Sequence, residues 1–240
     1  MRITFLGTRG NIEATSRRHR RHSAAMIHHR GRRVMVDCGA DWLGRVAELA
    51  PDAIVLTHAH ADHADGLRAG ASCPVHASAE TWDLIGGYPI EERRLLAPRV
   101  CELIAGIRFR ACPVQHSLRC PAVGYRIEAG LAAVFYVPDV AALPDHREAL
   151  AGIALVIGDG ASITRPILRE RDGVRLGHAP IGAQLGWCRD AGVRDAVFTH
   201  CGSEIVGGDE RRLGAKIRAR ARECGVRARI AYDGLEIDLP

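Results

Sequence analysis

Short apolar runs separated by turn residues recur along the chain and predict β-strands. Several runs, such as "AIVLT" at residues 53–57 and "ALVIG" at residues 154–158, are apolar on both faces. Such runs are typical of interior strands that are covered on each side by another layer. The pattern predicts strands over residues 2–6, 24–28, 33–36, 53–57, 107–114, 123–127, 131–137, 154–157, 196–199 and 227–231.

Stretches with helical character lie between these strands, at residues 41–49, 78–85, 180–191 and 209–223. The first half of the chain is rich in expected hairpins. Strands and helices in this arrangement predict two sheets that pack face to face with helices outside. The chain shows no internal repeat, low-complexity tract or Pro/Ser linker, so we expect one domain over residues 1–240.

The composition is that of an ordinary globular protein, with 47% apolar and 25% charged residues among 240. These values argue against a disordered chain. No apolar run approaches the roughly 20 residues of a membrane span. The N-terminus also lacks the charged-then-apolar layout of a secretory signal. We therefore expect a cytoplasmic protein with no membrane partner.

Cysteine usage and net charge narrow the picture only slightly. Eight cysteines are too dilute for a disulfide scaffold, and none forms a CxxC pair, so we expect reduced, mostly buried thiols. The net charge of +5 comes from 33 Lys and Arg residues against 28 Asp and Glu residues, and Lys216 is the only lysine. This charge is compatible with a phosphate-bearing substrate but does not require one.

The segment "THAHADHADG" at residues 57–66 concentrates three histidines and two aspartates directly after an apolar strand. If the chain stays extended there, His58 and His60 project to the same side. Asp62 and His63 follow where the chain turns toward a short helix, and both can swing back toward the same point. The cluster predicts ligands for one or two divalent cations. A histidine-bearing surface loop is the alternative, which the rarity of the H-x-H-x-D-H pattern disfavours.

Further ligands must come from other strand ends, because one loop does not surround two cations. Candidates follow three predicted strands, although each alone would often be an ordinary loop residue. The predicted sets are His58, His60 and His116 for one cation and Asp62, His63 and His200 for the other, with Asp139 as the bridge. Mixed imidazole and carboxylate ligands suit two divalent ions of zinc or manganese, with iron as a third candidate.

The segment 57–66, followed in order by the three strand-end ligands, resembles the metallo-β-lactamase superfamily. The turn Asp37-Cys38-Gly39 after a strand and the N-terminal Phe5-Leu6-Gly7-Thr8 are also similar to the opening hairpins of that superfamily. The resemblance spans nearly the whole chain. It implies an α+β fold, a four-layer αββα sandwich with the metals at one edge.

Within the superfamily, the bridging Asp139 and the sequence Gly177-His178-Ala179 are similar to the phosphodiesterase branch. That branch includes tRNase Z and the phosphoribosyl cyclic phosphodiesterases. The resemblance places His178 beside the metals without ligating them, so His178 is our candidate proton donor for the leaving oxygen. A histidine that caps a helix beginning near Pro180 is the alternative. Asp62, a predicted metal ligand, is the second candidate catalytic residue.

The chain departs from both members of that branch. Only 22 residues separate His116 from Asp139, which leaves no room for the tRNA-gripping arm that tRNase Z usually carries there. The phosphoribosyl cyclic phosphodiesterases, which act in phosphonate breakdown, typically hold a structural zinc with N-terminal cysteines, whereas the first cysteine here is Cys38. The chain therefore resembles a phosphodiesterase that lacks both of these additions, and the resemblance does not identify its substrate.

A basic loop, "SRRHRRHS" at residues 16–23, is the other notable feature. In the superfamily this loop lies near the metal edge, so its arginines are candidates to clamp a phosphate or follow a nucleic-acid backbone. A solvated basic loop is the alternative. The candidate substrate-binding residues are Arg17, Arg18, Arg20 and Arg21.

Two more aspartates flank the predicted ligands. Asp65 either orients a ligand imidazole or is a helix-start carboxylate. We expect Asp37 to be structural.

Together these features favour a dinuclear metal-dependent hydrolase in which a metal-bridging hydroxide attacks a phosphodiester. The expected substrates are a cyclic nucleotide, a cyclic sugar phosphate or an RNA 3′ end. One alternative is a hydrolase of the same fold that cleaves a lactone or thioester, and another is a nucleic-acid-binding protein whose metals only hold the fold together. RNA is a candidate partner, and a homodimer is the default oligomeric state.

Overall fold

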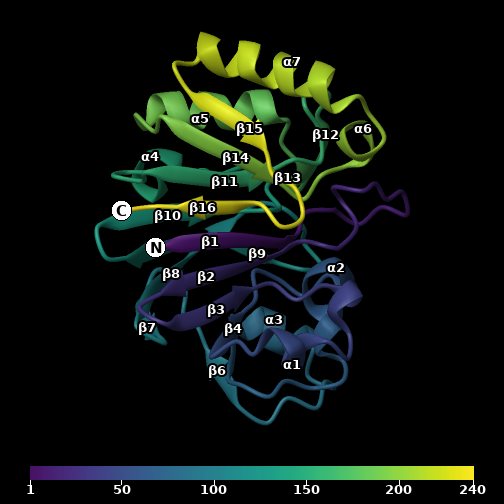
Figure 1. The fold of residues 1–240 in the computed structure, drawn as a ribbon, viewed down its shortest axis with the longest axis vertical. Coiled ribbons are helices and arrows are strands. Elements are labelled where there is room, and N and C mark those ends of the chain that lie inside the picture. Colours follow the sequence, from purple (N-terminus) through teal and green to yellow (C-terminus); the bar gives the residue numbers. More distant parts are fainter.

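The computed structural model describes all 240 residues and contains two seven-stranded sheets packed face to face (Figure 1). The first sheet has the order β16-β1-β2-β3-β4-β5-β6, and the second has the order β15-β14-β11-β10-β9-β8-β7. The strands of the first sheet are β1 (Arg2–Gly7), β2 (Ala24–His29), β3 (Arg32–Val36), β4 (Ala53–Val55), β5 (Val75–Ala77), β6 (Arg93–Leu95) and β16 (Glu236–Asp238).

The second sheet has mixed direction, and a separate hairpin follows it along the chain. Its strands are β7 (Cys101–Ile104), β8 (Ile107–Val114), β9 (Ala122–Ala129), β10 (Ala132–Tyr136), β11 (Leu155–Asp159), β14 (Asp195–Thr199) and β15 (Arg227–Ile230). The hairpin consists of β12 (Ile167–Arg171) and β13 (Val174–His178), which pair only with each other.

Helices lie on the outer side of each sheet (Figure 1). Those beside the first sheet are the 3₁₀ turns η1 (Ala40–Trp42) and η2 (Asp65–Leu67) and the helices α1 (Val46–Leu49), α2 (Ala61–Ala64) and α3 (Ala79–Leu84). Those beside the second sheet are α4 (His146–Ala149), α5 (Ile181–Asp190), α6 (Ser203–Val206) and α7 (Glu210–Glu223). None of the helices combines the length and the apolar character needed to span a bilayer.

Three hydrophobic clusters fill the spaces between these layers. The central cluster of 24 buried residues lies between the sheets and includes the rings of Phe5, Phe109 and Tyr125. A second cluster packs the outer face of the second sheet against α5 and α7, and a third packs the first sheet against the turns and helices near Trp42 and Leu67. The predicted αββα sandwich is confirmed by this layering.

Strand direction determines where the loops meet. Strands β3, β4, β5 and β6 are parallel in the first sheet, as are β10, β11, β14 and β15 in the second. Because β8 and β10 are both antiparallel to β9, β8 runs in the same direction as β10. The carboxyl ends of β8, β10, β11 and β14 therefore lie at one edge, which is where open sheets of this kind bind ligands.

All ten predicted strands are present, with bounds within two residues of those predicted. The predicted helix over residues 41–49 is wrong in its extent. The chain forms η1 and α1 instead, and Gly44 between them has a φ of 73°, outside the helical region.

The central cluster generates a stability prediction. Phe109 is fully buried, and its ring lies 5.9 Å from that of Tyr125 in an edge-to-face arrangement. We expect Phe109→Ala to lower the free energy of unfolding by about 3–5 kcal/mol, because it removes apolar contacts and leaves a cavity. Urea denaturation at fixed metal concentration measures this change. Leu131→Ala is the control, since Leu131 is 93% exposed. Equal losses in the two variants would contradict the assigned core.

Candidate metal centre

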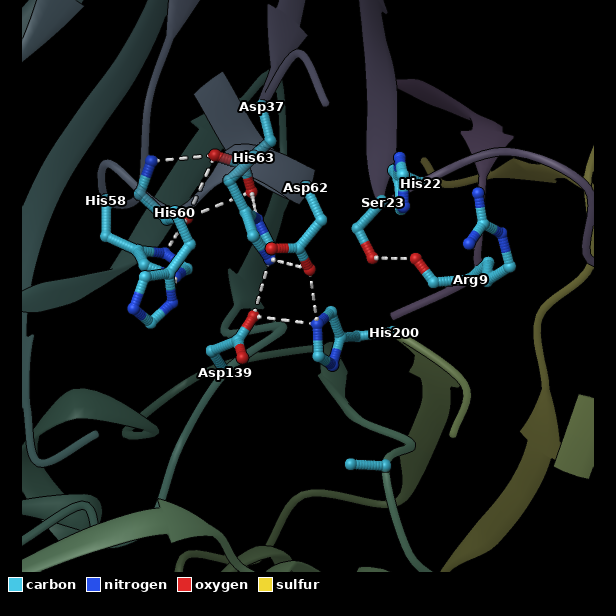
Figure 2. A network of polar contacts seen from close by, with 12 residues as sticks. Arg9, His22, Ser23, Asp37, His58, His60, Asp62, His63, Asp139 and His200 are labelled. Carbon is cyan, nitrogen blue, oxygen red and sulfur yellow. Dashed lines mark hydrogen bonds and ion pairs between the residues drawn. The ribbon is translucent and has the colours of Figure 1, made fainter. Parts of the chain in front are cut away.

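The segment after β4 combines a short extended stretch with one helical turn. His60 has extended backbone angles (φ −64°, ψ 151°), and α2 begins at the next residue. Asp37 fixes the start of the segment by accepting hydrogen bonds from the amide (2.8 Å) and the hydroxyl (2.9 Å) of Thr57. The backbone therefore follows the path that the sequence predicts, and it directs the histidines and Asp62 toward one edge of the sandwich (Figure 2).

Three imidazoles converge on one side of this edge. His58 Nε2 lies 2.9 Å from His60 Nδ1, and His116 Nε2 lies 3.3 Å from the same atom. Burial lowers the pKa of all three histidines, and that of His58 falls well below its usual value. His116 Nδ1 donates to the Gly177 carbonyl at 3.1 Å, which leaves its Nε2 available as a ligand atom.

Two more histidines lie among carboxylates on the other side. Asp62 Oδ2 is 3.0 Å from His200 Nε2 and 3.3 Å from His63 Nε2. Asp139 lies between the two groups. Its Oδ2 is 2.8 Å from His63 Nε2 (Figure 2), whereas its Oδ1 is 3.6 Å from His116 Nε2. One carboxylate thus faces both donor sets.

The charges on this side differ from those on the first. Burial alone would lower the pKa of His63, but the carboxylates Asp62, Asp139 and Asp37 outweigh it and raise the pKa well above its usual value. The same competition between burial and carboxylates, Asp139 first, raises the pKa of His200 to about 10. Without metal, both imidazoles therefore carry protons that balance buried negative charge. Metal ligation displaces such protons.

The donor atoms fit a divalent cation. Within each predicted set of three, the ligand atoms lie within 4.8 Å of one another. His63 Nε2 and Asp139 Oδ2 are buried and lack a hydrogen-bond partner of good geometry, although they lie close together. Buried polar atoms that converge in this way without a hydrogen bond of good geometry are arranged as metal ligands are.

The structure adds Asp159, which sequence analysis missed. This buried carboxylate ends β11 and accepts hydrogen bonds from the amides of Val140 (3.1 Å) and Ala161 (2.8 Å). One of its carboxylate oxygens lies within 4.8 Å of the possible ligand atoms of Asp139, His178 and His200. The signal was present, because Asp159 closes a buried strand in the same way as the other strand-end residues.

His178 is the last residue of β13 and faces the carboxylates. Its Nδ1 donates to Asp159 Oδ2 at 2.8 Å and lies 3.5 Å from Asp139 Oδ1. Burial lowers its pKa, but Asp159 outweighs burial and raises it. The N-cap of α5 is Pro180, with no side-chain cap. The helix-capping alternative is therefore wrong.

The two flanking aspartates have different surroundings. Asp37, which is completely buried, contacts His63 Nδ1 at 2.9 Å and so orients the imidazole of a candidate ligand. Asp65 accepts a hydrogen bond from Tyr88 and pairs with Arg68 at 2.9 Å, and it begins η2. Asp37, and not Asp65, therefore orients an imidazole. Asp65 agrees with the alternative of a helix-start carboxylate.

The four arginines of the basic loop are not gathered at the metal edge. The Arg18 guanidinium lies 4.1 Å from the Tyr232 ring centroid and pairs with Glu210, and that of Arg21 lies 4.7 Å from the Trp42 ring. Arg17 and Arg18 line a cavity of about 190 Å³ that contains none of the predicted ligands. Arg17 and Arg20 are exposed. Substrate binding by Arg17, Arg18, Arg20 and Arg21 stays a prediction.

A larger cleft opens beside the imidazoles. It has a volume of about 890 Å³ and is bordered by His60, His116 and His178. Its other walls are the loop at residues 117–119 and the hairpin of β12 and β13. The arginines that line this cleft, which sequence analysis did not single out, are Arg119, Arg169 and Arg171.

Comparisons with known proteins agree with this architecture. A model of the β-lactamase superfamily domain matches residues 32–201. Ribonuclease Z of Mycobacterium marinum is 26% identical over an alignment of 251 positions that spans 87% of this chain and 88% of the relative. Ribonuclease Z of Bradyrhizobium diazoefficiens is 33% identical over an alignment of 196 positions that spans 67% of this chain and 62% of the relative. The metallo-β-lactamase fold protein YhfI from Bacillus subtilis superposes with a TM-score of 0.77 at 16% identity, covering 98% of each chain.

The contact between Asp37 and His63 generates a prediction about metal affinity. We expect Asp37→Asn to weaken divalent-metal binding by about 10–100-fold, because the imidazole loses the carboxylate that orients it. Titration with zinc against a chromophoric chelator measures the affinity. Asp65→Asn is the matched control and should bind like the unmodified protein. The interpretation fails if both variants bind equally well.

Proposed function

Since the chain belongs to the β-lactamase superfamily and is a metal-dependent hydrolase with the metallo-β-lactamase fold, we propose that it is a dinuclear phosphodiesterase. The main support is the pair of donor sets with Asp139 between them. The Mycobacterium marinum relative, whose name is that of a ribonuclease, supports a phosphodiester as the bond that is cleaved.

In this proposal each donor set would hold one cation, and Asp139, which lies between the sets, would serve both. Bound there, two divalent cations would supply hydroxide near neutral pH and neutralise charge that develops on the phosphoryl oxygens. The mixed donors suit zinc, manganese or iron. The proposed ligands are His58, His60, Asp62, His63, His116, Asp139 and His200.

His178 supplies the proton for the departing oxygen. Its Nδ1 is engaged by Asp159, so Nε2 carries the other proton when the ring is charged. The side chain is 20% exposed and borders the cleft, where a substrate can reach it. Asp159 acts here as a positioning residue, because it orients the ring and favours its charged form. A phosphodiester has a poor alkoxide leaving group, so proton donation at this point lowers the barrier.

The cleft favours an anionic substrate over a neutral ester. Its charged lining consists of Arg119, Arg169 and Arg171 with one carboxylate, Glu170, besides the histidines. Guanidinium groups recognise phosphate oxygens well, whereas a lactone or thioester offers no comparable charge. The cleft also gives His60 and His116 of the first donor set access to solvent, which a purely structural metal site does not need.

Hydrolysis of bis(p-nitrophenyl) phosphate tests the proposed activity. We expect the protein loaded with zinc or manganese to release p-nitrophenolate, a chelator to stop the release, and added metal to restore it. Asp139→Asn should fall to the background rate, because it removes the charge that both cations share. Leu131→Ala, at an exposed position, is the control. Turnover of a neutral lactone or thioester with none of the diester would contradict the proposal and support the alternative hydrolase.

The role of His178 predicts a dependence on the leaving group. We expect His178→Ala to slow cleavage of a dinucleotide by about 10²–10⁴-fold, because the alkoxide leaves poorly without a proton. The loss should be much smaller with bis(p-nitrophenyl) phosphate, since p-nitrophenolate leaves without one. His146→Ala is the control, because His146 stacks on Trp187 outside the centre. Equal losses on both substrates, at unchanged metal content, would rule out proton donation.

A further inference from the structure

The hairpin of β12 and β13 carries charges that the metal centre does not use. Arg169 and Arg171 lie on β12 and, with Arg119 on the facing loop, line the cleft beside His178. Resting on the proposed function, we propose that these arginines form a subsite for a second phosphate of the substrate, one that is not cleaved. The protein would then select substrates with at least two phosphate groups.

The strand register places Arg169 and Arg171 on the same face of the hairpin as His178. Ile167 is paired with His178 and Arg169 with Leu176, so these four residues share one face. Side chains alternate along a strand, and Arg171 therefore projects to the same face. At a rise of about 3.4 Å per residue, Arg169 lies about 7 Å and Arg171 about 14 Å along the strand from Ile167.

The base of the hairpin is tied to a metal ligand. The Gly177 amide donates to the His116 carbonyl at 2.8 Å, and the Gly177 carbonyl accepts from the His116 ring. The Arg175 amide donates to Gln115 Oε1 at 3.1 Å. These contacts fix β13 relative to the donor sets. The arginines on the paired strand therefore lie at a defined distance from the cleaved bond.

The guanidinium groups are free to bind a ligand. Most arginines that the sheets expose are engaged, as in the pair Arg227–Asp195 at 2.6 Å and the pair Arg108–Glu128 at 3.0 Å. Arg119 and Arg169 form no such pair. Arg171 contacts only Asp172, at 3.5 Å, and both side chains are largely exposed. An exposed pair of this kind contributes little, so a phosphate displaces it readily.

The spacing distinguishes two sources of a second phosphate. The two phosphates of a diphosphate share an oxygen, so both would lie at the metals. The next phosphodiester along an oligonucleotide lies farther away, because a sugar and its ester oxygens separate the two phosphorus atoms. A subsite that begins about 7 Å along β12 fits that second arrangement. The cleft volume of about 890 Å³ also leaves room for a nucleotide between the two phosphates.

Three p-nitrophenyl substrates test this subsite. They are bis(p-nitrophenyl) phosphate, the p-nitrophenyl ester of thymidine 5′-phosphate, and that same ester with an added 3′-phosphate. We expect the 3′-phosphate to raise kcat/KM roughly tenfold, the effect of two exposed ion pairs. In the double variant R169E/R171E this preference should disappear, so that the thymidine esters with and without the 3′-phosphate are hydrolysed with equal kcat/KM. The p-nitrophenyl ester of thymidine 5′-diphosphate tests whether the second phosphate comes from a diphosphate instead.

Arg175→Glu is the matched control, because Arg175 is on the same hairpin but does not line the cleft. It should keep the preference. R169Q/R171Q repeats the test if the charge reversal does not fold. The inference is overturned if the 3′-phosphate gives no advantage, if R175E loses the preference equally, or if only the diphosphate ester is favoured. A metal-loaded protein that hydrolyses none of the esters would instead contradict the proposed function itself.

Discussion

Buried carboxylates whose only ion-pair partners are imidazoles are the constraint on which this structure depends. Asp62, Asp139 and Asp159 are almost completely buried, and their ion-pair partners are all histidines, without any lysine or arginine. Taking a carboxylate out of water costs several kcal/mol unless it is paired and hydrogen-bonded. Because the partners follow strands of both sheets, this pairing holds only when the two sheets pack in one relative position.

The fold and the centre of the site could be predicted because their signals are local. The candidate ligands between residues 58 and 63 share one loop, and His116, Asp139 and His200 each follow a strand with a clear apolar pattern. The hairpin of β12 and β13 lacks such a pattern, because every residue of β12 is exposed. Its turn, Asp172-Gly173, has positive φ at both positions and was a readable hairpin signal that sequence analysis did not use.

The orientation of the arginines could not be predicted in the same way. Arg18 and Arg21 stack on Tyr232 and Trp42, which are distant in sequence, and that choice depends on the assembled fold. The assignment of Asp37 had a similar difficulty. Only the folded chain shows that its carboxylate binds Thr57 and His63 together, because residues 37 and 63 meet through the parallel pairing of β3 with β4.

Gly177 connects the hairpin to the ligand His116, and its backbone has a φ of 101°. A side chain there would meet the Ile167 carbonyl oxygen at 2.0 Å, so only glycine allows this close approach. The hydrogen bonds that attach the hairpin to Gln115 and His116 come from Arg175 and Gly177 of β13, whereas every residue of β12 is exposed. Because the hairpin pairs with no strand of either sheet, a change in the length or charge of its outer end leaves the hydrogen-bond ladders of both sheets intact.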